Sequence, residues 1–177
     1  MFVAYLNKEQ QAYGQYVDYI GQYLDECQDG KCFIYTSTLT IAEITRKRLV
    51  NSAYGTFTDF LNEYQGAIVQ VSADPTVMQL ASEIKNLSYV KTGGKRDVGT
   101  GDAIHLASAL VLPDAFGVNL KEFHTFDNGH SKGLEGKGVP LLSYETWCGE
   151  CRTHPVAQRV IGLSRKKPDH PNPMLFK

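Results

Sequence analysis

Three acidic side chains stand at positions suited to metal chemistry. Asp102 opens an apolar segment, whereas Glu43 and Asp127 each follow a strand-like run; these three segments are residues 103–111, 32–36 and 122–126. In a parallel α/β sheet, ligands bind beyond the carboxyl ends of the strands. We therefore expect the three carboxylates to meet at one edge of such a sheet.

Clustered carboxylates favour a hard divalent cation. Mg²⁺ and Mn²⁺ prefer carboxylate and water oxygens, and such an ion binds a phosphate and lowers the pKa of a bound water. Crowded carboxylates repel one another, and a cation relieves that repulsion. Clustering of Glu43, Asp102 and Asp127 in a chain of near-neutral charge is therefore itself an argument for a bound cation.

Each acid also has a purely structural interpretation. The segment from Thr40 to Glu43 matches a capping box, residues 127–129 read Asp-Asn-Gly and suit a turn, and Asp102 suits the first turn of a helix after a glycine break. These alternatives stay open at the level of sequence. His105, one helical turn beyond Asp102, is interpreted as a packing or hydrogen-bonding histidine.

Composition limits the class of protein. The chain has 177 residues, 42% hydrophobic and 21% charged, with a formal net charge of -1. This predicts about one globular domain and no overall attraction to nucleic acid or membrane. The first residues lack a basic signal region, and no apolar run approaches about 18 residues. We expect a cytoplasmic protein with four reduced cysteines.

Helical and strand-like segments alternate along the chain. Apolar spacing and caps predict helices over residues 8–27, 41–50, 57–64, 75–87 and 103–111. Apolar β-branched runs predict strands over 32–36, 67–72, 122–126 and 139–143, the last near an edge because it contains a proline. This order predicts an α/β fold with a parallel sheet and right-handed crossovers.

The segments that hold the acids resemble the successive motifs of a known family. Residues 38–44, 101–109 and 124–130 resemble those of PIN domains, particularly VapC-type toxins, over roughly residues 1–145. The resemblance implies a three-layer α/β/α fold and a Mg²⁺- or Mn²⁺-dependent endoribonuclease. On matched positions, Glu43, Asp102 and Asp127 would bind the metal, with Thr125 as a polar neighbour. It also implies an RNA substrate, an antitoxin partner and a homodimer.

One part of the family pattern has no counterpart here. PIN domains open with a strand that ends in aspartate, whereas residues 1–7 resemble the portion after that aspartate. We expect the sheet of this chain to lack that central first strand. Either the native protein starts upstream of Met1, or the chain is a shortened member of the family. The alternative function is that of a catalytically inactive PIN-like protein that binds RNA or protein, because the first aspartate is missing.

Two regions lie outside the acidic motifs. Residues 91–101 form a predicted glycine-rich basic loop, in which Lys95, Arg96 and Lys91 contact RNA phosphates or are simply solvated. Residues 146–177 are expected to form a largely extended C-terminal extension.

The cysteines raise the question of zinc. Cys148, Cys151 and His154 have a metal-like spacing, but a zinc site completed by Cys27 and Cys32 is disfavoured. The two cysteine pairs are expected at opposite edges of the sheet.

Overall fold

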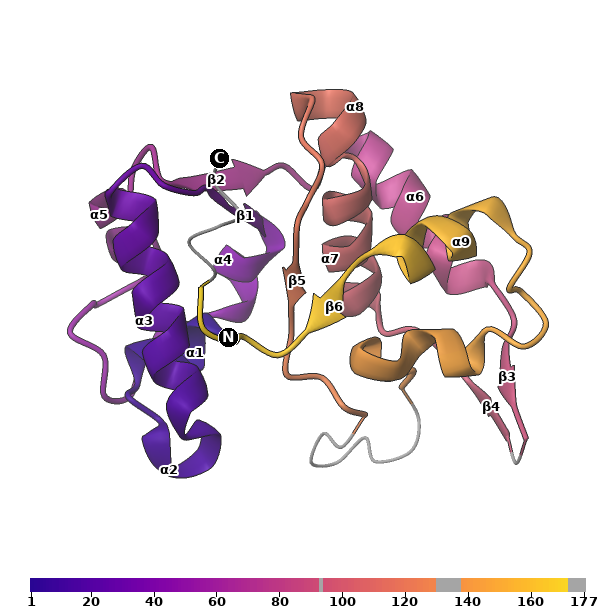
Figure 1. The fold of residues 1–177 in the computed structure, drawn as a ribbon, viewed down its shortest axis with the longest axis horizontal. Coiled ribbons are helices and arrows are strands. Elements are labelled where there is room, and N and C mark those ends of the chain that lie inside the picture. The colour runs from indigo at the N-terminus through magenta and orange to yellow at the C-terminus, as the bar shows by residue number, and fades with distance from the viewer. Residues whose placement is uncertain (93, 130–137, 172–177) are drawn as a thin grey trace. The chain divides into compact units, whose positions relative to one another are not determined.

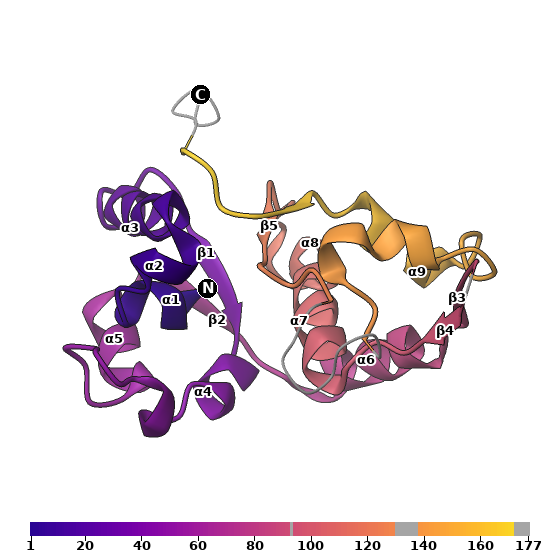
Figure 2. The same cartoon turned by 90° about the horizontal axis from the view of Figure 1, so that it is seen from below.

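The computed structural model describes residues 1–92, 94–129 and 138–171 and is a mixed α/β protein. The chain divides into two compact units, Met1–Val71 with Pro168–Lys177, and Ser72–Lys167 (Figures 1 and 2). Residue 130 of the motif at 124–130 and residues 172–177 of the expected C-terminal extension lie outside the described residues.

The first unit is built from short helices and one parallel strand pair. Its strands β1 (Ile34–Ser37) and β2 (Ile68–Val71) pair in parallel, with Ile34 opposite Ile68. Its helices are α1 (Phe2–Leu6), α2 (Gln10–Tyr13), α3 (Gln15–Gln28), α4 (Leu39–Glu43) and α5 (Phe57–Glu63), with a 3-10 turn at Arg46–Arg48. Fully buried Leu24 and Phe60 anchor its core. The predicted strands at 32–36 and 67–72 and the helix at 57–64 are confirmed to within two residues.

The predicted helix over residues 8–27 is wrong as a single element. It is interrupted at Gly14, whose φ of 54° and ψ of -135° end α2 and begin α3. Glycine tolerates this conformation because it has no Cβ. The predicted apolar face survives in α3, where Val17, Ile20 and Leu24 are buried.

The predicted helix over residues 41–50 is also wrong. Helix α4 ends at Glu43, and Thr45 takes an extended conformation before the 3-10 turn. Ile44 and Leu49 are both buried, yet five residues apart they would lie on different faces of a continuous helix. The break after α4 leaves both side chains buried.

The second unit packs α6 (Pro75–Asn86), α7 (Thr100–Leu110) and α9 (Pro155–Gly162) around one core. Asp74 caps α6 by accepting a hydrogen bond from the Val77 amide at 2.9 Å, as its position before proline predicts. Helix α7 is buried over most of its length, which confirms the interpretation of its apolar sequence. The short helix α8 (Leu112–Phe116) follows it.

Three predictions for the second unit need correction. Part of the expected loop at 91–101 belongs to an antiparallel hairpin of β3 (Tyr89–Lys91) and β4 (Gly94–Arg96). The expected strand at 139–143 overlaps η2 (Leu141–Trp147), a 3-10 segment kinked at Ser143 that buries Leu141, Tyr144 and Trp147. Instead of an extended chain, residues after 146 include α9 and β6 (Arg165–Lys166).

The described strands form three separate two-stranded sheets. Besides β1–β2 and the β3–β4 hairpin, β5 (Phe123–His124) pairs in parallel with β6. The predicted parallel pairing is therefore present in small sheets. Across the described residues, no helix has the length and apolar character needed to cross a membrane.

Candidate functional site

Asp102 lies in the first turn of α7 and is half-buried. A Cβ added at Gly99, the residue before the helix, would lie only 2.9 Å from Asp102 Oδ2, so this carboxylate folds back over the helix entrance. A negative charge at a helix N-terminus is stabilised by the helix dipole. Gly99 thus leaves room for a carboxylate that the helix itself favours.

Asp127 lies just after β5 and joins two parts of the second unit. Its Oδ1 accepts a hydrogen bond from the Gly129 amide at 2.9 Å, and its Oδ2 accepts one from the Leu141 amide at 2.9 Å. The Asp127 amide donates to Thr125 Oγ1 at 3.0 Å. The carboxylate therefore holds a turn and the start of η2, while each oxygen keeps acceptor capacity for another partner.

Glu43 is the last residue of α4 and is exposed. The capping box proposed for it is absent, since Thr40 lies inside the helix and its hydroxyl pairs with that of Thr36 at 3.0 Å. Burial lowers the pKa of the Met1 amino group, while the nearby charges of Glu9 and Glu43 act in the opposite direction. Glu43 therefore lies close to Met1.

The three predicted acids do not belong to one compact unit. Asp102 and Asp127 are in the second unit, where the chain through β5 runs alongside α7 (Figures 1 and 2), and Glu43 is in the first. Among the described residues of either unit taken alone, no three His, Cys, Asp or Glu side chains bring ligand atoms within 4.8 Å of one another. In the second unit, the two predicted ligands are carboxylates, which suit Mg²⁺ or Mn²⁺ by donor type.

The basic residues predicted to contact RNA lie on the β3–β4 hairpin and differ in their surroundings. The Arg96 guanidinium stacks over the Trp147 ring at 4.2 Å from its centroid and donates to the Gly138 carbonyl at 3.0 Å. Lys91 reaches the same ring at 5.6 Å. Lys95 on β4 is exposed, as is Lys91, whereas Arg96 is half-buried.

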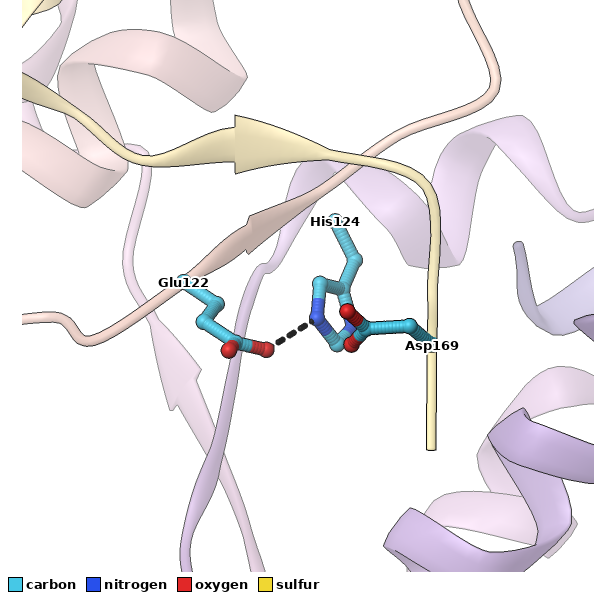
Figure 3. Close-up of side chains that lie close together, drawn as sticks. All are labelled: Glu122, His124 and Asp169. Carbon is cyan, nitrogen blue, oxygen red and sulfur yellow. Dashed lines mark hydrogen bonds and ion pairs between the residues drawn. The ribbon is translucent and has the colours of Figure 1, made fainter. Parts of the chain in front are cut away.

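Sequence reasoning missed a charged cluster on the β5–β6 pair. Glu122 Oε2 lies 2.7 Å from His124 Nε2 (Figure 3), and Glu122 Oε1 lies 2.7 Å from Lys166 Nζ. Asp169, also drawn there, belongs to the other unit. The sequence did hold a signal for Glu122 and His124, because residues two apart in a strand lie on the same face. Lys166 gave no such signal, because its segment was expected to be extended and unpaired.

The cysteines lie as two pairs, one in each unit, and all four are free thiols. His154 does not complete a zinc site with Cys148 and Cys151 among the described residues; instead its Nδ1 accepts a hydrogen bond from the Val156 amide at 3.3 Å and caps α9. Burial raises the pKa of the Cys148 thiol to about 12. Without a bound metal ion, the Cys148 thiol is therefore protonated at neutral pH.

Comparison of the chain with family models, curated proteins and solved structures found no match.

Proposed function

We propose that the protein is a Mg²⁺- or Mn²⁺-dependent endoribonuclease with a PIN-like fold, in which Asp102, Asp127 and Glu43 act as the metal-binding acids. The observation that carries the proposal is the half-buried carboxylate of Asp102 at the head of the apolar helix α7. The three-layer arrangement, the antitoxin partner and the homodimer belong to the same proposal, and all rest on the resemblance of the acidic motifs to VapC-type toxins.

The protein residues have separate tasks in this proposal. Asp102 supplies an oxygen ligand at a helix N-terminus, where its charged form is favoured. Asp127 supplies a second ligand, and its orientation is held by the Gly129 and Leu141 amides. The Thr125 hydroxyl positions Asp127 by accepting a hydrogen bond from the Asp127 backbone amide. When bound, the cation would neutralise the scissile phosphate and lower the pKa of an attacking water.

Lys95 is the residue best placed to attract RNA. It is exposed on β4, and neighbouring Arg96 is already engaged by Trp147 and Gly138. Lysine contacts to phosphate strengthen binding without regard to base sequence. Lys95 therefore contributes affinity, while cleavage depends on the acids.

A cleavage assay tests the proposal. RNA is incubated with Mg²⁺ or Mn²⁺ and either the chain as given or a version extended by the in-frame codons upstream of Met1. We expect cation-dependent cleavage that Asp102→Asn abolishes. Asp114→Asn is the matched control, because the Asp114 side chain is 85% exposed and lies on the neighbouring helix α8. Equal cleavage by Asp102→Asn, or none by either version, would reject the enzyme.

One observation favours a non-catalytic alternative. Both carboxylate oxygens of Asp127 already accept a backbone amide, which is the pattern of a structural turn. In a PIN-like protein that binds RNA or protein without cleaving RNA, Asp127 would serve only to hold this turn. RNA binding that persists without cations, with no cleavage, would support that alternative.

A further inference from the structure

Cys148 and Cys151 flank a tight turn at the end of η2. Gly149 and Glu150 form the turn between them. The first and last Cα atoms of a four-residue turn lie within about 7 Å, and a disulfide usually joins Cα atoms about 4.4 to 6.8 Å apart. The backbone therefore brings the two cysteines to a separation that a disulfide spans.

Contacts of Cys148 fix the start of this turn. Its Sγ donates a hydrogen bond to the Tyr144 carbonyl at 3.4 Å. The same turn packs on the β3–β4 hairpin. Cys148 forms an isolated parallel β-bridge with Val90, and a Cβ added at Gly149 would lie 2.9 Å from the Val90 carbonyl oxygen. The dithiol is thus part of a tightly packed turn.

The two sulfurs differ in their access to solvent. Cys148 is 0% exposed, whereas Cys151 is 7% exposed and lines a pocket of about 540 Å³ together with Ser88, Glu150 and His154. A small molecule in this pocket reaches Cys151 first. Cys148, three residues earlier on the same turn, is placed to react with whatever has bonded to Cys151.

We infer that Cys148 and Cys151 form a redox-active dithiol that small organic disulfides oxidise through this pocket. The Cys151 thiolate attacks one sulfur of the disulfide, whose S–S bond breaks and releases one thiol after protonation. Cys148 then attacks Cys151 Sγ, the mixed disulfide bond breaks, and the departing thiolate takes the Cys148 proton and leaves as the second thiol. The pair loses two electrons, and the small disulfide gains them.

Burial affects both the rate and the equilibrium of this exchange. It raises the pKa of the Cys148 thiol to about 12 and also raises the pKa of Cys151, which the hydrogen bond from Cys148 partly offsets. Exchange is slow where little thiolate is present. The reduced form gains no stabilisation as a thiolate, so the disulfide, once formed, is stable.

Peptide mapping of the full chain tests the inference. The reduced, folded protein is treated with 2-hydroxyethyl disulfide, a small neutral probe, then alkylated and digested with trypsin. Residues 138–152 form one tryptic peptide that contains both cysteines, whereas Cys27 and Cys32 fall in two different peptides. We expect peptide 138–152 to lose both alkylatable thiols and two hydrogen masses.

Single substitutions test the order of attack. Cys148→Ser is expected to accumulate a mixed disulfide on Cys151, while Cys151→Ser leaves Cys148 largely unmodified in the folded protein. Fluorescence of Trp147, the single tryptophan and the neighbour of Cys148, reports that each variant is folded. Full alkylation of the peptide after treatment of the native chain, a link from either cysteine to another peptide, or equal adducts on both variants would overturn the inference.

Discussion

Asp127→Asn separates a structural role from a metal-binding role at this position. The wild-type carboxylate accepts the Gly129 amide with one oxygen and the Leu141 amide with the other, each at 2.9 Å. Asparagine keeps one acceptor oxygen but places an NH₂ group opposite the second amide. One of the two backbone amides, of Gly129 or of Leu141, would then lose its partner.

The expected cost follows from that lost hydrogen bond. A hydrogen bond to a charged group stabilises a protein by about 1.5 to 3 kcal/mol, and Asp127 is only half-buried, so we expect about 1 to 2 kcal/mol for Asp127→Asn. Asp127→Ala loses both acceptors and is expected to cost about 2 to 4 kcal/mol. A carboxylate that served metal binding alone would leave the metal-free protein equally stable.

Urea unfolding in the presence of a chelator measures these differences. Asp114→Asn is the control, because its exposed carboxylate lies 3.8 Å from Arg159 and is expected to change stability by less than about 0.5 kcal/mol. If Asp127→Asn matched this control, the reasoning from the two amide contacts would be refuted.

Three further predictions concern the second unit. Gly149→Ala should destabilise this unit by about 1 to 3 kcal/mol, because the new Cβ would lie 2.9 Å from the Val90 oxygen. Gly162→Ala, whose Cβ would meet nothing within 4 Å, should cause no such destabilisation, and thermal unfolding compares the two variants. Lys95→Gln should weaken RNA binding and reduce its salt slope by roughly 1, measured by filter binding at several salt concentrations. Burial raises the pKa of the Tyr89 and Tyr144 hydroxyls, so the folded protein keeps these protons at a pH at which the unfolded chain loses them. The free energy of unfolding should therefore fall as pH rises above about 10, the ordinary pKa of tyrosine. The fall should be smaller in a variant with phenylalanine at both positions.

Local signals in the sequence predicted the elements with strong apolar periodicity and clear caps. The Asp74 cap before Pro75 and the apolar face of α6 identified that helix, and the unbroken apolar character of α7 predicted its burial. Asp102 was placed at the head of α7 for the same reason. In these segments the local preferences and the packed structure agree.

Other features depended on contacts that the sequence does not reveal. The backbone angles that Gly14 adopts between α2 and α3, and the extended conformation of Thr45 after α4, were not marked by the apolar spacing. The Leu141 amide that binds Asp127 lies 14 residues away, and β6 pairs with β5 across about 40 residues. Such long-range partners are set by tertiary structure, which local periodicity does not encode.

In the proposed function, Asp102 helps to hold a divalent cation. A Mn²⁺ titration followed by electron paramagnetic resonance measures this directly, with the chain, Asp102→Asn and Asp114→Asn compared at equal concentration. We expect a bound Mn²⁺ whose affinity falls at least about tenfold in Asp102→Asn, equivalent to about 1.4 kcal/mol, and is unchanged in Asp114→Asn. Equal Mn²⁺ affinity in all three proteins would contradict a metal-binding role for Asp102.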